Sequence, residues 1–303
     1  MQFKTAVDKT GKHMVLALVD KTWQKVASDK TVLELLTSET QSLQFTPLSE
    51  EEKLFKEVLP FAPKAYRDFM LYEKHAIDAA RGFVKKYMSG LLPIVNTYEK
   101  FTGKTFPKLK PKARYYKHPI YYMGNHLNFY THNDAVAIPA YTKELDYELE
   151  LAAVITKPLK NATKEEVSDA IGGFVILNDF SARDVQLDEM QSGFGPMKAK
   201  NFANAISSVV ASKDDLIDTL DKLAVEVKIN DAVIAKADTS GSLYTLQEAI
   251  AYASWEEQLH PGELFGSGTI PGCTGIENGV LLKKGDSITL TIEGIGHLTN
   301  NIV

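Results

Sequence analysis

A strand with alternating acids places the strongest constraint on how this chain can fold. Residues 146–155 read DYELELAAVI, so Asp146, Glu148 and Glu150 alternate with aromatic and apolar residues. A period of two is typical of a β-strand with two different faces. Three carboxylates on one face repel one another, and acids have low strand propensity. The pattern therefore predicts a strand whose acids share a positively charged partner.

A second apolar run, residues 174–177, ends in Asn178-Asp179 and is followed by a polar turn over residues 181–186 that contains Arg183 and Gln186. Taken alone, Glu148 and Glu150 fit a solvated strand edge equally well. Adding Asp179 at the end of a buried strand favours a metal site. Ligand sets made only of oxygen select Mg²⁺, Ca²⁺ or Mn²⁺ over zinc or copper.

Composition excludes several classes of protein. The chain has 303 residues, of which 44% are hydrophobic, enough for a large core and about two domains. Its net charge of −5 gives no basic face for nucleic acid or an anionic membrane. The single cysteine, Cys273, rules out an internal disulfide framework and fits a reducing compartment. With neither a leader pattern nor a long apolar window, we expect a cytoplasmic protein that does not bind membranes.

We place a domain boundary, without a sharp linker, between residues 45 and 60. Short strand patterns predict a small β-rich N-terminal domain over residues 1–60, ahead of a larger domain over 61–303. A long helical pattern over residues 65–88 places Asp68, Tyr72 and His75 at i, i+4 and i+7, on one face. Residues 90–117, rich in lysine and turn signals, are interpreted as a solvated loop.

Several familiar motifs are absent from the sequence. The glycines over residues 266–272 lack dinucleotide-binding spacing and open no helix. Ser267 lacks the GxSxG frame of a nucleophile elbow, and there is neither a P-loop nor HExxH. Taken singly, His75 would be interpreted as a histidine on the surface or in a capped helix, and Lys200 as a surface lysine. In a cleft, Lys200 could instead stabilise an oxyanion.

Six segments, taken together, resemble the fumarylacetoacetate hydrolase family. They occur in the family's order from about residue 62 to the C-terminus: RDFMLYEKHA (67–76), LDYELELAAVI (145–155), GFVILNDFSARDVQ (173–186), GPMKAKNFANAISS (195–208), GSGTIPGCTGIE (266–277) and GDSITLTIEGIGHLTN (285–300). The resemblance implies an α+β fold that is mainly β. It would be a mixed β-sandwich roll over residues 61–303, usually assembled as a homodimer.

The resemblance also assigns roles to single residues. It implies that Mg²⁺, Ca²⁺ or Mn²⁺ is bound by four acids: Asp68, Glu148, Glu150 and Asp179. His75 would be the general base, oriented by Glu277. The substrate side would comprise Arg183, Lys200, Gln186, Tyr122 and Thr269. Of these, Arg183 and Lys200 would stabilise the oxyanion, while Tyr122 and Thr269 would hold carboxylate or carbonyl oxygens.

The function implied is hydrolysis of a carbon–carbon bond in a β-diketo acid or an acylpyruvate. The metal would chelate the small oxo acid, and His75 would deprotonate the attacking water. One alternative is a metal-dependent decarboxylase of oxaloacetate-like 2-oxo acids, which needs no attacking water. A second alternative is a catalytically silent, metal-dependent binding protein.

Four features depart from the family's pattern. Met70 stands where fumarylacetoacetase has a substrate-binding tyrosine, and Val84 falls near the position of its arginine, with Arg81 the closest basic residue. Ala199 replaces the usual glycine before Lys200, and the N-terminal unit is short. These differences argue against fumarylacetoacetate itself as the substrate.

Overall fold

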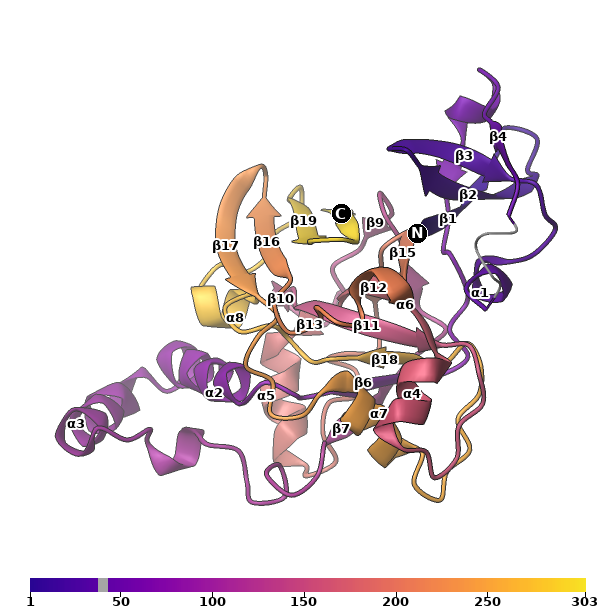
Figure 1. The fold of residues 1–303 in the computed structure, drawn as a ribbon. Helices are drawn as coiled ribbons and strands as arrows, with labels where there is room; N and C mark the ends of the chain where they lie inside the picture. Colours follow the sequence, from indigo (N-terminus) through magenta and orange to yellow (C-terminus); the bar gives the residue numbers. More distant parts are fainter. Residues whose placement is uncertain (38–42) are drawn as a thin grey trace.

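A large mixed sheet forms the centre of the molecule (Figure 1) in a computed structural model that describes residues 1–37 and 43–303. Its main path follows the order β4 (Phe45–Pro47), β3 (Thr22–Val26), β2 (His13–Val19), β1 (Gln2–Val7), β15 (Val209–Ser212), β12 (Ile171–Asn178), β11 (Leu149–Ile155), β18 (Leu264–Gly266), β6 (Tyr66–Phe69) and β7 (Tyr121–Gly124). Three short strands join it at the side: β5 (Lys56–Glu57), β8 (Phe129–Tyr130) and β14 (Asn204–Ile206).

Two smaller sheets complete the β architecture. The larger of them has the order β17 (Ala232–Asp238), β16 (Ala224–Ile229), β19 (Ser287–Ile292), β20 (Gly296–Ile302) and β9 (Ala135–Val136). The other pairs β10 (Leu145–Asp146) with β13 (Ser181–Ala182). In the part of the chain that the structure describes, strands thus outweigh helices, which confirms the predicted fold class.

Strand β11 is packed on both faces, and its side chains alternate between two hydrophobic clusters, as the period of two predicts. Leu149 and Leu151 point into the main hydrophobic cluster, which also contains the apolar side chains of β16, β19 and β20. Ala152 and Val154 point to the opposite face, into a second cluster shared with β1. Glu150 lies on that opposite face as well, because side chains alternate along a strand. The whole strand is buried, so its acid is withdrawn from water.

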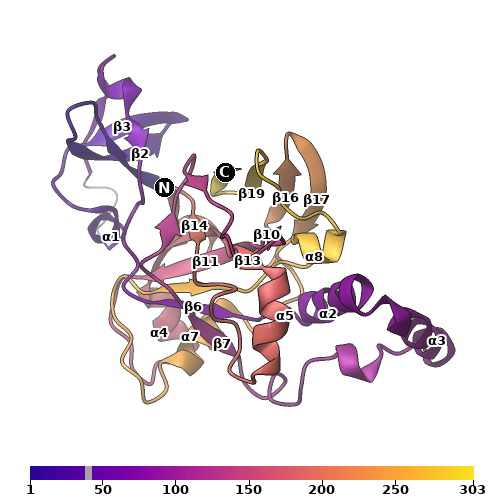
Figure 2. The same ribbon diagram turned by 180° about the vertical axis from the view of Figure 1, so that it is seen from behind.

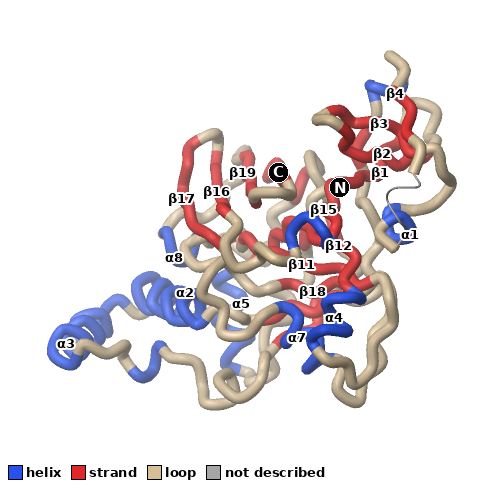
Figure 3. Tube along the Cα trace, in the orientation of Figure 1, coloured by secondary structure: helices blue, strands red, loops and turns tan. Residues whose placement is uncertain are grey.

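The longer helices lie outside the sheets (Figure 3). They are α2 (Glu73–Tyr87), α3 (Leu92–Thr102), α4 (Lys164–Ala170), α5 (Arg183–Gln191) and α7 (Leu246–Ala253); α1 (Val32–Leu35), α6 (Lys213–Leu216) and α8 (Gly275–Asn278) are single turns, and 3₁₀ turns occur at Glu52–Leu54, Ser89–Leu91 and Pro107–Leu109. Helices α2 and α3 extend away from the sheets, and α5 lies beside α2 in both views (Figures 1 and 2). No helix of the described residues is long and apolar enough to span a membrane.

Three predicted elements are wrong. The helix expected over 65–88 begins only at Glu73, because residues 66–69 form β6 between β18 and β7, and strand pairing outweighs helical spacing there. The predicted loop over 90–117 contains α3, which Gly103 ends in the left-handed conformation. The predicted turn over 181–186 is β13 followed by the first residues of α5.

The N-terminal strands are joined to the main sheet rather than separate from it. Strand β1 pairs with β15 through Phe3 and Val210, and β2, β3 and β4 follow it outward. The predicted division into domains over residues 1–60 and 61–303 therefore stays a prediction.

Candidate active site

Three carboxylates from three parts of the main sheet meet at one point. Asp68 lies on β6, Glu150 lies on β11, and Asp179 follows β12 directly. Strand β18 runs between β6 and β11, and a Cβ at its Gly266 would overlap the carboxylates of both Asp68 and Glu150. Because glycine has no side chain, these two acids can meet across β18. One oxygen from each of the three acids lies within 4.8 Å of the others.

The cluster has the chemistry of a site for a hard divalent cation. All three acids are buried, and in the described part of the chain neither Asp68 Oδ1 nor Glu150 Oε1 has a hydrogen-bond partner. Buried polar atoms without partners are rare and costly in proteins. Carboxylate oxygens are the ligands that Mg²⁺, Ca²⁺ and Mn²⁺ prefer. The residues therefore fit the predicted cation.

The three-acid cluster has too little positive charge around it to compensate its buried carboxylates. Burial and the neighbouring Asp179 raise the pKa of Asp68 well above its ordinary value, and burial and Asp68 do the same for Glu150. Burial also raises the pKa of Asp179 to about 6, although Lys200 lowers it. Each shift has the direction expected for carboxylates that lose water and face like charges. A bound cation would reverse it.

Glu148, the fourth predicted ligand, is held by two cations. Its carboxylate accepts from Arg183 Nη2 at 2.5 Å and from Lys200 Nζ, and Lys200 Nζ also reaches Asp179 Oδ2 at 2.6 Å. Burial opposes ionisation, but Arg183 and Lys200 outweigh it and hold the pKa of Glu148 below its ordinary value. Glu148 is therefore an ionised neighbour of the three-acid cluster, and its role as a ligand stays a prediction.

His75 and Glu277 form the predicted pair. His75 Nδ1 lies 2.5 Å from Glu277 Oε1, and the N–H of Gly272 donates to Glu277 Oε2 at 2.7 Å. A Cβ at Gly82 would overlap the carbonyl of Ile276, so a glycine here lets α2 and α8 approach closely. The shared helix expected for Asp68 and His75 is wrong, since Asp68 is on β6. The turn between β6 and α2 still brings both to one cavity.

A cavity of about 450 Å³ joins these groups. Nine of the eleven predicted site residues line it: Asp68, His75, Tyr122, Glu148, Glu150, Arg183, Gln186, Lys200 and Thr269. The other two, Asp179 and Glu277, contact lining residues from behind. Tyr122 Oη donates to Asp179 Oδ2 at 2.8 Å, and Arg183 Nη1 donates to Gln186 Oε1 at 2.7 Å. The roles of Tyr122, Gln186 and Thr269 toward a substrate stay predictions.

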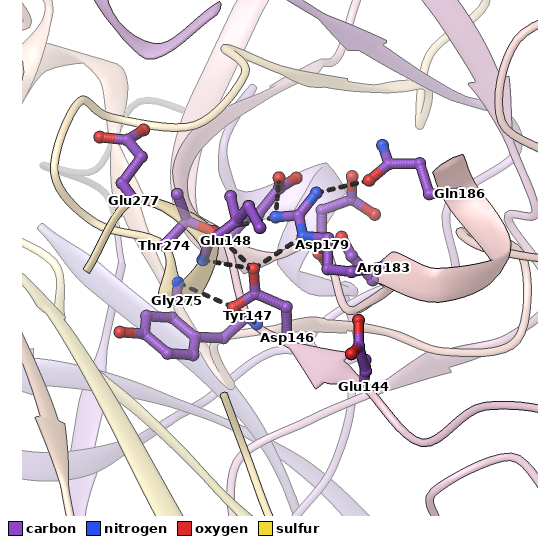
Figure 4. A network of polar contacts seen from close by, with 12 residues as sticks. Glu144, Asp146, Tyr147, Glu148, Asp179, Arg183, Gln186, Thr274, Gly275 and Glu277 are labelled. Carbon is purple, nitrogen blue, oxygen red and sulfur yellow. Dashed lines mark hydrogen bonds and ion pairs between the residues drawn. The ribbon is translucent and has the colours of Figure 1, made fainter. Parts of the chain in front are cut away.

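Asp146 connects two parts of this site and was not predicted to do so (Figure 4). Its fully buried carboxylate accepts from Arg183 Nε at 2.7 Å, from the hydroxyl of Thr274 at 3.0 Å, and from the backbone N–H groups of Gly275 and Ile276 at 2.7 and 2.8 Å. It thus ties Arg183 to the first turn of α8, the helix that carries Glu277. Asp146 is a positioning residue for both.

The expected single strand through the three acids is divided in the structure, although its alternation is kept, because Tyr147, Leu149 and Leu151 all lie in the main hydrophobic cluster. Asp146 belongs to β10, whereas Glu150 belongs to β11, and the chain between them is not part of either strand. Glu148 forms an isolated bridge with Thr274 at this break. The alternating pattern identified the buried acids but carried no signal for this break between β10 and β11. A buried arginine needs anionic partners, and Arg183 was the signal for the role of Asp146.

Comparison with known proteins gives one family. The sequence model described as fumarylacetoacetate hydrolase C-terminal matches residues 97–303. A fumarylacetoacetate hydrolase domain-containing protein 2 homologue of Dictyostelium discoideum is 32% identical over 181 residues, which cover 56% of this chain and 59% of that protein. An oxaloacetate tautomerase of Bacillus subtilis is 30% identical over 188 residues, covering 61% of this chain and 62% of that protein.

Solved structures share the whole fold. A fumarylacetoacetate hydrolase from Exiguobacterium antarcticum has a TM-score of 0.72 at 19% identity, covering 100% of this chain and 99% of that chain. A 5-carboxymethyl-2-hydroxymuconate delta-isomerase from Mycobacterium smegmatis has a TM-score of 0.70 at 19% identity, with the same coverage. At this identity the likeness concerns the fold alone, and it confirms the roll architecture that the sequence predicted.

The acid cluster predicts how pH and metal affect stability. A raised folded-state pKa stabilises the fold below the unfolded pKa, and that contribution is lost as the pH rises through the folded pKa. For Asp179 this window runs from its ordinary 3.8 to about 6. We therefore expect the increase in melting temperature on adding Mg²⁺ to be several-fold larger at about pH 8 than at about pH 5, because ionised acids bind the cation.

Differential scanning fluorimetry with and without Mg²⁺ measures this difference. Glu150→Gln should stabilise the metal-free protein at the higher pH and lose the response to Mg²⁺. Asp188→Asn, which replaces an exposed acid on α5, is the matched control and should behave like the unaltered protein. An equal response to Mg²⁺ in Glu150→Gln would contradict the assigned site.

Neutralising Asp146 should lower the free energy of unfolding more than neutralising Asp184, an acid on α5. Asp146→Asn would turn an amide N–H₂ or a neutral oxygen toward Arg183 Nε and leave the buried guanidinium undercompensated. We expect the free energy of unfolding to fall by about 3 kcal/mol, as when buried ion pairs lose one partner. Asp184→Asn, beside Arg183 but bonded to Thr142, should cost less than about 1 kcal/mol. Urea unfolding compares the two, and equal losses would refute the role of Asp146.

Proposed function

The chain belongs to the fumarylacetoacetate hydrolase family, and we propose that it is a divalent-metal-dependent hydrolase that cleaves a carbon–carbon bond in an acylpyruvate-type β-diketo acid. The observation that carries the proposal is a single cavity that receives both His75, paired with Glu277, and the acids Asp68 and Glu150. A general base beside a cation site is the arrangement that metal-assisted hydrolysis requires. Because the matched regions cover 59% and 62% of the two relatives described above, less than two thirds of their length, their activities enter only as support.

Asp68, Glu150 and Asp179 would hold the cation, with Glu148 as the further predicted ligand. When bound, a divalent cation supplies a Lewis acid that polarises a carbonyl and lowers the energy of an enolate. Lys200 lies within 2.6 Å of Asp179 and so brings an ammonium group to the same end of the cavity. It would hold the carboxylate of the 2-oxo acid or a developing oxyanion.

His75 would move the proton. Its Nδ1 faces Glu277, which fixes the tautomer and leaves Nε2 as the basic nitrogen. Nε2 takes a proton from water, and the water oxygen bonds to the acyl carbonyl carbon, C4. The C3–C4 bond then breaks, its electron pair remains on C3 as the enolate of pyruvate, and the proton returns to C3. One acylpyruvate and one water thus give one carboxylic acid and one pyruvate.

A second candidate, keto–enol tautomerisation of a 2-oxo acid, has a specific observation in its favour. The mitochondrial oxaloacetate tautomerase of Homo sapiens is 30% identical over 174 residues, covering 56% of this chain and 54% of that protein, and a bacterial relative has the same name. In that reaction His75 would take a proton from C3 instead of from water. The same residues would serve both reactions, so the product distinguishes them.

The remaining expectations belong to the same proposal. They are a small oxo acid as the partner, a homodimer as the assembly and the cytoplasm as the location. The net charge of −5 supports the absence of a nucleic-acid partner.

Isotope incorporation tests the proposed reaction. Incubation of acetylpyruvate and Mg²⁺ with the protein in ¹⁸O-labelled water should place the label in acetate, as measured by mass spectrometry. Loss of enol absorbance without cleavage would instead establish the tautomerase, and release of CO₂ would establish a decarboxylase. His75→Ala should lower kcat by about 10²–10⁴-fold, the usual contribution of a general base. His13→Ala, an exposed histidine on β2, is the control, and equal rates in both variants would refute the assignment.

A further inference from the structure

The cavity has two chemically different ends. One end carries the cation site, Lys200 and His75. The other is lined mainly by apolar side chains of two helices, Ala79, Ala80 and Phe83 of α2 and Leu187 and Met190 of α5, together with apolar residues of the loops beside them. Helices α2 and α5 lie side by side in both views of the fold (Figures 1 and 2). The apolar end is thus a slot between them.

The α2 wall of this slot is open because its residues are small. Ala76, Ala79, Ala80 and Phe83 are spaced i, i+3, i+4 and i+7, so they share one face of the helix. Three alanines on that face leave space that larger side chains would fill. At the mouth, Met190 and Phe194 are 54% and 89% exposed. An apolar ligand in the slot would shield these side chains from water.

No cation at this end of the cavity is free to bind a second carboxylate. In the described residues, the only arginine and lysine that line the cavity are Arg183 and Lys200. Arg183 lies 6.0 Å from the ring centroid of Phe83, but it is already bonded to Asp146, Glu148 and Gln186. Lys200 is bonded to Glu148 and Asp179. The slot therefore offers a distant carboxylate no cation that is not already paired with an acid.

Arg81, the residue nearest to the family's arginine in sequence, points elsewhere. Its guanidinium makes two hydrogen bonds of 2.9 Å to the carboxylate of Glu99 on α3. It lines a separate hollow, beside Lys74 and Lys110, rather than the cavity with the acids. Met70, at the position of the family's tyrosine, does line the cavity and adds to its apolar wall.

We propose that the substrate is a 2-oxo acid with an uncharged alkyl or aryl substituent that occupies the slot between α2 and α5, and that dicarboxylic 2-oxo acids are poor ligands. This deepens the proposed function, on which it rests for the 2-oxo acid head at the cation site. A buried apolar group gains affinity with each methylene, whereas a carboxylate without a partner loses its hydration. The cavity volume of about 450 Å³ lies in the range of sites for small ligands.

Binding of matched acids tests the proposal without requiring turnover. Calorimetric titration in the presence of Mg²⁺ would compare 2-oxohexanoate with 2-oxoadipate, which have the same chain length. We expect 2-oxohexanoate to bind at least about tenfold more tightly. Along the series 2-oxobutanoate, 2-oxohexanoate and 2-oxooctanoate, affinity should rise about threefold to fourfold per methylene until the slot is full. Equal or tighter binding of 2-oxoadipate would overturn the proposal.

Two variants locate the slot. Ala80→Leu should weaken 2-oxooctanoate about tenfold and leave 2-oxobutanoate unchanged, and Ala80→Ser is the control of unaltered volume. Met70→Arg should shift the preference toward 2-oxoadipate, whereas Met123→Arg, on the exposed side of β7, should not. Unchanged preferences in both variants would refute the slot.

The results separate the two proposals. Preferential binding of 2-oxohexanoate by a protein that cleaves no acylpyruvate would leave the slot intact and reject the hydrolase. Cleavage of acylpyruvates with a preference for a diacid would reject the slot alone. Failure of all these acids to bind in the presence of Mg²⁺ would reject both.

Discussion

An excess of buried negative charge governs the architecture of the site. Two buried cations, Arg183 and Lys200, face five buried acids: Asp68, Asp146, Glu148, Glu150 and Asp179. Arg183 satisfies Asp146 and one oxygen of Glu148, and Lys200 bridges Glu148 and Asp179. Asp68 and Glu150 are left with mutual repulsion and unpartnered oxygens. A divalent cation at this point would offset the excess where it is greatest, and would explain why the fold tolerates so many buried acids.

The sheet and the Arg183 network together place the chemistry. Strands β6, β11 and β12 supply the acids, and Gly266 of β18 lets two of them meet. Asp146 links Arg183 to the first turn of α8 and so fixes Glu277, which in turn holds His75. His75 and Asp179 are thereby both placed by contacts that lead back to the buried pair of Arg183 and Lys200. A rigid arrangement of this kind is what positioning of a reactant requires.

The sequence predicted which side chains meet at the cavity better than it predicted the elements that carry them. The period of two in DYELELAAVI predicted a strand, and residues 149–155 of this segment form β11. The spacing of Asp68 and His75 also fits a helix, but pairing of β6 with β18 decides otherwise, and no local pattern reports such distant pairing. The role of Asp146 depends on Arg183, 37 residues away, and on Thr274, Gly275 and Ile276, 128 to 130 residues away. The apolar slot depends on the mutual placement of α2 and α5.

The most direct measurement is the position of a bound cation. Anomalous scattering from a crystal grown with Mn²⁺ would locate it without reference to activity. We predict one peak within about 2.5 Å of carboxylate oxygens of Asp68, Glu150 and Asp179, at the buried end of the cavity that His75 lines. A crystal with no peak there, or with Mn²⁺ bound only at other acids, would contradict the claim that these three residues form the cation site.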